Sequence, residues 1–207
     1  TNSQYEIVKS KIEYPLAETL RTWIEENALT GVFRIIEDYK RYYPLNSLAS
    51  EVLGFTGTDN YGLYGLEAYY EDTLAGKPGR VVTAKNGWGD ELSTKMKFEK
   101  TVDAEDGNSL VLTIDSVVQY YAEKYLEIAV KENGCTNRGA CIIMDVNTGA
   151  IVAMATKGDF DPNDPMTVTD PDAAAAIALL SGDERSEALK KAREEQWVNK
   201  PISDYYE

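Results

Sequence analysis

The residues best suited to ligand chemistry are the oxygen-bearing side chains of one proline-rich stretch. Over residues 159–170 they stand at positions 1, 3, 5, 6 and 12 of a twelve-residue window, as Asp159, Asp161, Asn163, Asp164 and Asp170. An EF-hand calcium loop shares several of these positions, but it needs Gly at position 6 and the longer Glu at position 12. Prolines also fill positions 4 and 7. The pattern therefore favours a solvated loop with Asx turns, and we predict neither a metal site nor a cofactor.

Nucleophilic and acid–base catalysis find little support in the composition. The chain has no His, which excludes a His-based triad, a His proton shuttle and His-ligated zinc. Cys135 and Cys141 fit neither a C-x-x-C metal pair nor a disulfide framework, so unpaired thiols are favoured over a bridge. The 35 acidic residues could include a glycosidase pair, but no spacing singles one out.

The charge balance bears on partners. The 21 basic and 35 acidic residues give a net charge of -14, which repels a phosphate backbone, so we predict no nucleic-acid partner. The charge is uneven, because residues 1–104 hold 12 basic and 16 acidic residues, whereas residues 105–207 hold 9 and 19. No apolar run approaches the roughly 20 residues that a membrane-spanning helix needs.

Strand and helix patterns alternate in the first half. A helix is predicted over residues 15–27, with one buried stripe formed by Leu16, Leu20, Trp23 and Ile24. The other expected elements are strands over 5–12 and 32–39, a helix over 48–53 capped by Asn46 or Ser47 and stopped by Gly54, a loop over 56–65, a helix over 66–74, and a hairpin turning at Asn86-Gly87.

A polar linker, "DAEDGN", predicts a domain boundary near residue 104. Beyond it we expect a strand over 109–115 and then a helix capped by Asp115 or Ser116. The helix should bury Val118, Tyr121, Ala122, Tyr125, Leu126 and Ala129. Two apolar strands, "GACIIMDV" and "AIVAMAT", predict a hairpin within a sheet that is covered on both faces. Two helices, over 173–180 and 184–197, complete the prediction of an α+β fold.

Several of these segments together resemble one protein family. They are "KRYYP" from Lys40, "LASEVLGF", "GLYGLEAYYEDTLAGKPG" from Gly62, "LTIDSVVQ" from Leu112, "GACIIMDVNTGAIVAMA" and "FDPNDP". Their order and spacing are similar to those of class B penicillin-binding proteins, the bacterial D,D-transpeptidases that cross-link peptidoglycan. The resemblance extends over roughly residues 5–207 and implies a pedestal, or dimerization, domain over 1–104. It further implies that 105–207 form the N-terminal part of an incomplete α/β transpeptidase domain.

The resemblance also bears on catalysis. In that family a stretch like W-x-N-x-x-I-x-D-x-Y-E, matched here by Trp197 to Glu207, runs into P-G-S-T-F-K with the acylated Ser of S-x-x-K. No Ser of this chain is followed by Lys at the third place, and neither S-x-N nor K-T-G occurs. The expectation is that the chain stops before its nucleophile, is inactive alone, and lacks the family's membrane anchor before Thr1.

For individual residues, the resemblance implies structural roles rather than ligand contacts. Glycines would serve in turns, Arg41 in an ion pair, and Glu67 as a bridging or capping carboxylate. The motif residues are Arg41, Gly62, Gly65, Glu67, Gly76, Gly79, Asp115, Gln119 and Gly149.

The parent protein would meet peptidoglycan stem peptides, β-lactams and membrane proteins of wall synthesis at the outer face of the cytoplasmic membrane. An incomplete transpeptidase sheet would expose an edge, so self-association is a further expectation. The main hypothesis is thus a non-catalytic part of a transpeptidase that positions the catalytic domain and offers a binding surface. Two other hypotheses are an intact acidic extracellular enzyme acting on glycan through carboxylates, and an acidic surface adhesin.

Overall fold

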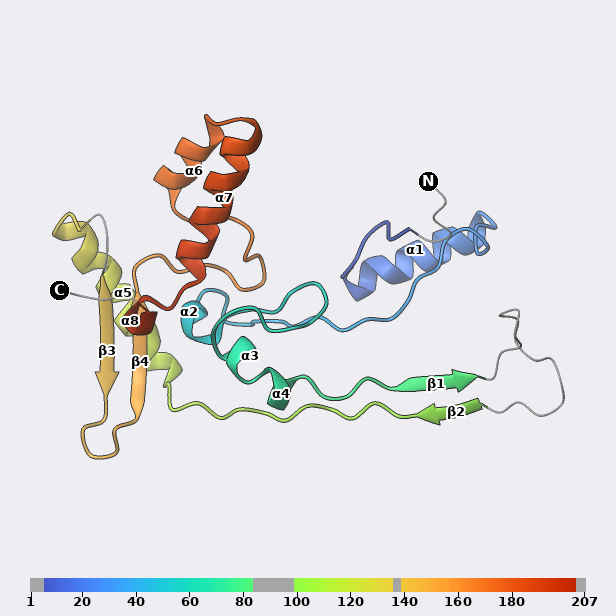
Figure 1. Ribbon diagram of the computed structural model, residues 1–207, viewed down its shortest axis with the longest axis horizontal. Coiled ribbons are helices and arrows are strands. Elements are labelled where there is room, and N and C mark those ends of the chain that lie inside the picture. Colours follow the sequence, from blue (N-terminus) through green and yellow to red (C-terminus); the bar gives the residue numbers. More distant parts are fainter. Residues whose placement is uncertain (1–5, 84–98, 136–138, 204–207) are drawn as a thin grey trace.

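The computed structural model describes residues 6–83, 99–135 and 139–203, and it is elongated (Figure 1). One end carries α1 and a two-stranded ribbon, and the other end carries a β-hairpin with most of the helices. The elements are α1 (Tyr14–Glu26), α2 (Ser50–Leu53), α3 (Gly65–Tyr69), α4 (Glu71–Leu74), β1 (Arg80–Thr83), β2 (Glu99–Val102), α5 (Ser116–Glu132), β3 (Ala140–Met144), β4 (Ile151–Thr156), α6 (Pro171–Ala178), α7 (Gly182–Trp197) and α8 (Lys200–Ser203). Both sheets are antiparallel pairs, β1 with β2 and β3 with β4, which confirms an α+β fold.

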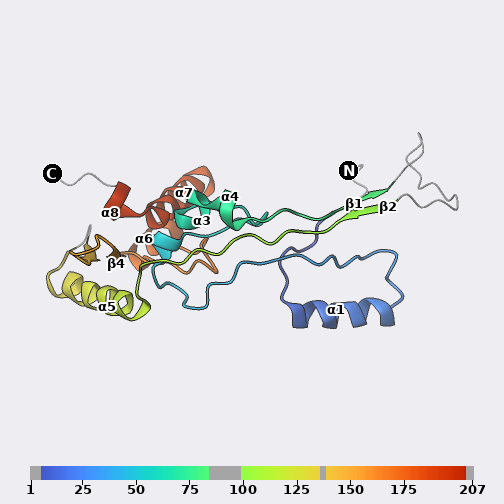
Figure 2. The ribbon, with the colours of Figure 1, turned by 90° about the horizontal axis from the view of Figure 1, so that it is seen from below.

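Helix α1 forms where it was predicted, but its environment differs from the prediction. A proline in the first turn favours its start. Of the expected stripe only Ile24 is buried, while Leu16 and Trp23 remain 53% and 50% exposed. Figures 1 and 2 both show α1 separated from the β1–β2 ribbon. The prediction of a buried stripe is therefore wrong for Leu16, Leu20 and Trp23.

The strands predicted on either side of α1 are also wrong. Residues 6–13 and 32–40 form no strand in the described part of the chain, although Tyr5 lies outside it. Side chains hold these segments instead: the Lys11 ammonium lies 2.8 Å from the Asp38 carboxylate and donates to Asn60 Oδ1 at 2.9 Å. A β-branched run becomes a strand only when a neighbouring strand pairs with it, and none does here.

The predicted ribbon is present. Strands β1 and β2 pair from Arg80 opposite Val102 to Thr83 opposite Glu99, and a further bridge joins Lys77 to Glu105. The Asn86-Gly87 turn lies outside the described residues. The helix expected over 66–74 is divided in two, since α3 ends at Tyr69 and α4 begins at Glu71, with Tyr70 as the cap between them.

The caps predicted for the short helix α2 are wrong. The helix begins at Ser50, and its N-cap is Ala49, which has a left-handed φ of 54° and no side-chain acceptor. Gly54 ends the helix as predicted.

In the second half, Asp115 caps α5 as predicted, because its carboxylate accepts hydrogen bonds from the N–H groups of Val117 and Val118. The strand predicted over 109–115 is wrong. Only isolated bonds attach this segment to β4, from Thr113 Oγ1 to the Ile151 carbonyl at 2.6 Å and from the Asp115 N–H to the Val152 carbonyl at 2.9 Å.

Helix α5 packs on one face of the β3–β4 hairpin (Figure 2). The buried centre of this contact is small, formed by Ala122, Ala153 and Ala155 with Val118 and Leu126 beside them. Tyr121, Tyr125 and Ala129 of the predicted apolar face are exposed. Most of β3 is also exposed, including Ile142 and Met144. The prediction of a sheet covered on both faces is therefore wrong for the described residues.

The two C-terminal helices agree with the prediction, whereas α8 was missed. Asp170 caps α6 by accepting from the N–H groups of Asp172 and Ala173. Within the described residues, no helix is both long and apolar enough to cross a membrane.

Candidate functional site at the junction of the two halves

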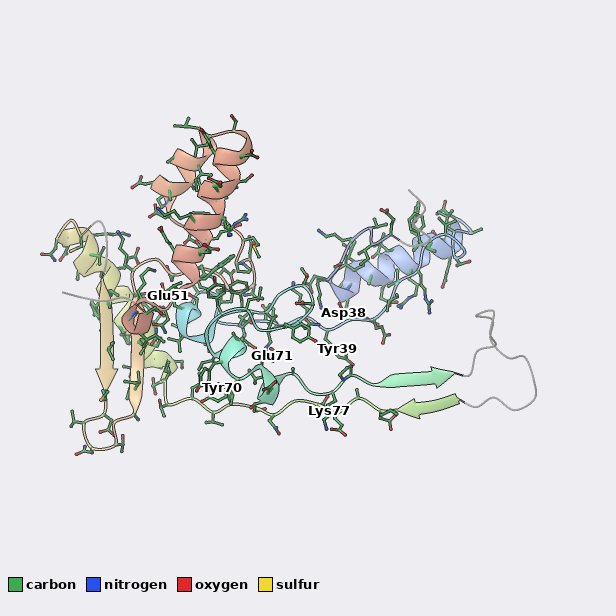
Figure 3. All side chains as sticks on the ribbon, in the orientation of Figure 1. Asp38, Tyr39, Glu51, Tyr70, Glu71 and Lys77 are labelled. Carbon is green, nitrogen blue, oxygen red and sulfur yellow. The ribbon has the colours of Figure 1, made fainter. Side chains whose placement is uncertain are left out.

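A network of long-range contacts lies where residues 41–71 of the first half meet residues 119–200 of the second. Figure 3 places the Glu51 side chain in this region, between α2 and α8, while Lys77 lies out toward the ribbon. We treat this junction as the candidate site, because its ion pairs, buried carboxylates and aromatic rings come from segments that are distant in sequence.

An aromatic cluster forms the apolar centre of the junction. The Phe55 ring, fully buried, stacks on Tyr64 with ring centroids 5.7 Å apart and meets Phe160 edge-on at 5.8 Å. Trp197 at the end of α7 lies 5.0 Å from Phe55 and 5.2 Å from Tyr64, and its indole N–H donates to the Pro165 carbonyl at 2.8 Å. Aromatic pairs of this geometry add about 1 kcal/mol each beyond the area they bury.

A bidentate ion pair borders the cluster. Arg41 Nε donates to Glu67 Oε1 at 2.7 Å, and Arg41 Nη2 donates to Oε2 at 2.9 Å. The Tyr43 hydroxyl donates to Glu67 Oε1 at 3.3 Å. The Glu67 hydrogen bonds raise the pKa of the Arg41 guanidinium, and burial followed by the Glu67 charge raises the pKa of the Tyr43 hydroxyl. The Glu67 carboxylate thus lies between the fixed Arg41 guanidinium and the Tyr43 hydroxyl, and both donate to it.

Asn163 ties the acidic loop to the same place. The Tyr43 N–H donates to Asn163 Oδ1 at 3.0 Å, and Asn163 Nδ2 donates back to the Tyr43 carbonyl at 2.9 Å. Asp161 Oδ1 holds the amide by accepting from the Asn163 N–H and Nδ2, each at 2.8 Å. This is the Asx turn predicted for the loop. In the described part of the chain, no group of three or more acidic or thiol side chains is arranged to hold a metal ion.

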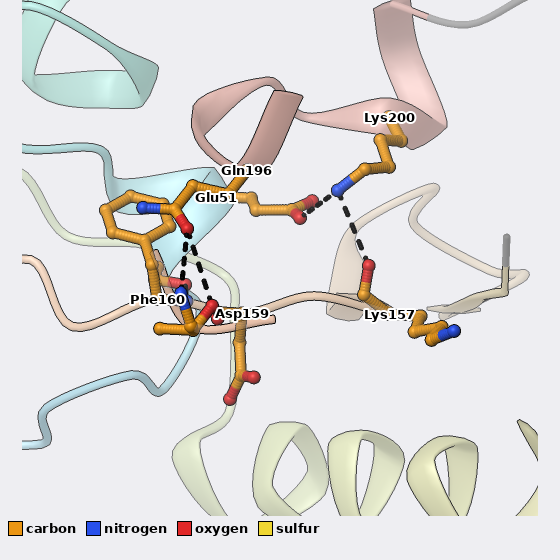
Figure 4. Close-up of polar contacts among 8 residues, drawn as sticks. Glu51, Lys157, Asp159, Phe160, Gln196 and Lys200 are labelled. Atoms are coloured by element: carbon orange, nitrogen blue, oxygen red, sulfur yellow. Dashed lines mark hydrogen bonds and ion pairs between the residues drawn. The ribbon is translucent and has the colours of Figure 1, made fainter. Parts of the chain in front are cut away.

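A buried ion pair joins α2 to α8. The Lys200 ammonium lies 2.8 Å from Glu51 Oε1, and it also donates to the Lys157 carbonyl at 3.4 Å (Figure 4). The Glu51 side chain is 6% exposed, and the Lys200 side chain is 18% exposed. Burial raises the pKa of the Glu51 carboxyl above its usual value, and Lys200 offsets part of this effect.

A second carboxylate, which is half-buried, links α5 of the second half to the first half. Glu123 of α5 accepts from the Ala49 N–H at 2.8 Å and from Gln119 Nε2 at 2.7 Å. The fully buried Gln119 amide also pairs with the backbone of Met154, donating to its carbonyl and accepting from its N–H, both at 2.8 Å. Burial raises the pKa of the Glu123 carboxyl.

Gln196 fixes the acidic loop to α7. Its Nε2 donates to the carbonyls of Pro165 and Thr167 at 3.1 and 3.0 Å, and its Oε1 accepts from the Thr169 N–H at 3.3 Å. The sequence analysis did not single out Gln196, Glu51, Glu123 or Lys200. Only burial distinguishes them, and periodicity carries no signal for a buried polar residue within a polar helix face.

The predicted motif residues fall into two groups. Arg41, Glu67 and Gln119 lie in the junction, and so does Gly65, which has a φ of +60° and where an added Cβ would stand 2.5 Å from the Gly54 nitrogen. Such a close approach of two backbones is open only to glycine.

The remaining motif residues lie around the junction or beyond it. A Cβ added at Gly62 would stand 2.1 Å from the Glu67 carbonyl oxygen. A Cβ added at Gly76 would stand 2.3 Å from the Glu105 carbonyl oxygen. Gly79 lies against residues 102–104 near the ribbon, and Gly149 lies in the β3–β4 turn. Asp115 is the cap of α5.

The site offers positioning rather than bond-making chemistry. The charged groups that cross the junction, Glu51 with Lys200 and Glu123 with the Ala49 N–H, are engaged with each other or with the backbone. Cys135 and Cys141 are free thiols outside it. The arrangement can fix the first half of the chain against α5, β4 and the C-terminal helices.

Comparison with known proteins identifies relatives. Residues 1–112 match the model of the penicillin-binding protein dimerisation domain. The stage V sporulation protein D of Bacillus subtilis is 34% identical over 86% of this chain and 28% of its own length. The peptidoglycan D,D-transpeptidase FtsI of Escherichia coli K12 is 30% identical over 68% of this chain and 23% of its own length. The chain thus spans about a quarter of the length of these curated relatives.

Solved structures give the same result. The chain is similar to a peptidoglycan synthetase from Bifidobacterium adolescentis, with a TM-score of 0.55 and 26% identity over 78% of this chain and 28% of that one. It is also similar to a chain in the complex between penicillin-binding protein PBP2 and MreC from Helicobacter pylori, with a TM-score of 0.58 and 25% identity over 88% of this chain and 36% of that one.

Proposed function

The chain belongs to the class B penicillin-binding proteins, and on this premise we propose that it is the pedestal and joint of a peptidoglycan transpeptidase. In this role it positions the catalytic domain of a longer protein and presents a surface to partners in wall synthesis. The observation that carries the proposal is the junction itself, where groups from the two sides of residue 104 pair: Lys200 with the Glu51 carboxylate, and the Glu123 carboxylate with the Ala49 N–H.

The proposed positioning of the catalytic domain depends on contacts close to the C-terminal end of the described residues. Trp197 and Lys200 belong to the segment that the family resemblance places just before the acylated serine. Because both side chains are held by first-half residues, Phe55 and Glu51, the position of the pedestal would set the position of that segment. This chain contains no S-x-x-K, so the proposed role is positioning, and acylation would need sequence beyond it.

Labelling with a fluorescent penicillin tests the proposal. The longer parent is expected to form a covalent adduct and the present chain none. The Arg41→Ala variant of the parent is expected to acylate more slowly, because the bidentate pair with Glu67 is lost. Lys77→Ala serves as the matched control, since it removes an exposed ribbon ion pair with Glu105 outside the junction. An unchanged rate in Arg41→Ala would argue against a positioning role.

The partner surface is proposed on α1. Leu16, Leu20 and Trp23 are exposed at helical spacing, and an exposed apolar stripe of this kind commonly marks a binding surface. The similar PBP2 chain was solved in complex with MreC, which supports a protein partner of wall synthesis. Trp23→Glu should abolish binding to the MreC counterpart of the same organism in a purified-protein titration, while Thr22→Glu on the same helix should bind normally. Equal binding by both variants would place the surface elsewhere.

We further propose that the parent acts outside the cytoplasm on peptidoglycan stem peptides and is acylated by β-lactams. The named relatives are peptidoglycan transpeptidases, and the same penicillin-labelling assay tests this part. We retain self-association through the exposed β3 edge as a proposal to be tested by analytical ultracentrifugation.

A further inference from the structure

A small cavity lies within the junction, between α2, α5 and β4. Its volume is about 10 Å³, and an internal site needs roughly 10 to 15 Å³ open to the centre of a water-sized sphere to hold one water molecule. The walls are polar on several sides. The lining residues on which the argument depends are Glu51, Glu123, Thr156, Asp159 and Asn199.

Two buried oxygen atoms in this region have no hydrogen-bond partner. They are Glu51 Oε2 and Asn199 Oδ1, and each exposes less than 1 Å². The Glu51 side chain is 6% exposed, so solvent outside the protein does not satisfy its second oxygen. Both atoms are hydrogen-bond acceptors, and therefore they cannot satisfy one another.

One neighbouring donor, the Thr156 hydroxyl, lines the cavity and offsets part of the rise that burial causes in the pKa of the Glu51 carboxyl, and two others are engaged elsewhere. Lys200 donates to the other Glu51 oxygen and to the Lys157 carbonyl. The Gln119 amide donates to Glu123 and to the Met154 carbonyl. The Thr156 hydroxyl has one hydrogen to donate and cannot serve both Glu51 Oε2 and Asn199 Oδ1, whereas a single water molecule can donate to both.

We propose that the cavity binds one ordered water molecule, which donates one hydrogen bond to Glu51 Oε2 and the other to Asn199 Oδ1. The surrounding charge favours this orientation, since three carboxylates, from Glu51, Glu123 and Asp159, line the cavity and Lys200 is the cation paired with Glu51. The water links α2 of the first half to the residue that precedes α8. This inference concerns the protein's own architecture and holds independently of any role in wall synthesis.

A crystal structure of the chain at a resolution that shows ordered water tests the proposal. The expected result is one water within hydrogen-bond distance of both oxygen atoms, and its loss in Asn199→Leu. Asn133→Leu, at the exposed end of α5, is the matched control and should keep the water. A dry cavity would overturn the proposal. So would a Thr156 hydroxyl or a turned Asn199 amide that donates to Glu51 directly, or an ion with several short oxygen contacts.

A solution measurement covers the case in which a variant fails to crystallise. The Ala155 methyl group belongs to a residue that lines the cavity, so a water resident for longer than nanoseconds should give a nuclear Overhauser effect to it. The signal is expected in the unmodified chain and in Asn133→Leu and is expected to vanish in Asn199→Leu. Absence of the signal from the unmodified chain, or its persistence in Asn199→Leu, would contradict the assignment.

Discussion

Replacing Lys200 with Met removes the cation from a buried ion pair while keeping most of the side-chain volume. The ammonium lies 2.8 Å from the Glu51 carboxylate, a distance at which the attraction is about 6 kcal/mol at an effective dielectric constant of about 20. Because Lys200 is 18% exposed, part of this attraction is offset by water. Removing one partner of a buried ion pair lowers the free energy of unfolding by about 3 kcal/mol. We expect a loss of that size for Lys200→Met at neutral pH.

The pH dependence distinguishes this mechanism from a simple loss of packing. Burial raises the folded-state pKa of Glu51, so its stability contribution is fully present below the unfolded pKa of about 4.3 and is lost as pH rises through the folded pKa. Without Lys200 the folded pKa rises further. The loss in Lys200→Met should therefore be full at pH 7 and shrink toward pH 4, where Glu51 is neutral in both states.

Urea denaturation followed by circular dichroism at pH 7, 5.5 and 4 measures this effect. Glu51→Gln is the matched variant, because it leaves no buried anion and should destabilise less than Lys200→Met at pH 7. A loss in Lys200→Met below about 0.5 kcal/mol, the size of a neutral surface substitution, would refute the buried pair. A loss that does not change with pH would refute the role of Glu51.

Five further variants, at four positions, test other parts of the account by the same denaturation assay. Arg41→Lys should cost about 1 kcal/mol, because an ammonium cannot form both bonds to Glu67; no change would contradict the bidentate pair. Gly65→Ala should cost at least about 2 kcal/mol, since the added Cβ would stand 2.5 Å from a backbone nitrogen at a φ of +60°; a neutral result would refute the close approach. Trp197→Ala should cost about 3 kcal/mol by opening the aromatic cluster, and a loss under 1 kcal/mol would mean that the cluster is loosely packed. Asp115→Ala should lower the free energy of unfolding by about 1 kcal/mol, because the cap of α5 is lost. Asp115→Asn should keep most of the stability that the cap provides, because an Asn side chain can accept the same hydrogen bonds.

Features set by local sequence were predicted well. The apolar spacing and the proline of α1, the aspartate cap of α5, and the hairpin of β3 and β4 all depend on neighbouring residues. The strands predicted over 5–12, 32–39 and 109–115 failed, because a strand also needs a partner that local composition does not specify.

The junction was less predictable for a related reason. Arg41 and Glu67 are 26 positions apart, and Glu51 and Lys200 are 149 apart, so no spacing rule connects them. The family resemblance singled out both residues of the first pair, though not their pairing with each other. Glu51 looked like any other of the 35 acidic residues, and only its burial and its ion pair with Lys200 of α8 distinguish it.

The central claim is that the junction sets the position of the catalytic domain, and the acylation rate of the longer parent protein by a fluorescent penicillin tests it most directly. The account predicts covalent labelling of the parent, no labelling of the present chain, and slower labelling of the parent carrying Lys200→Met than of the parent carrying Lys77→Ala. Equal rates for these two parent variants, with the junction loosened in hydrogen exchange, would contradict it.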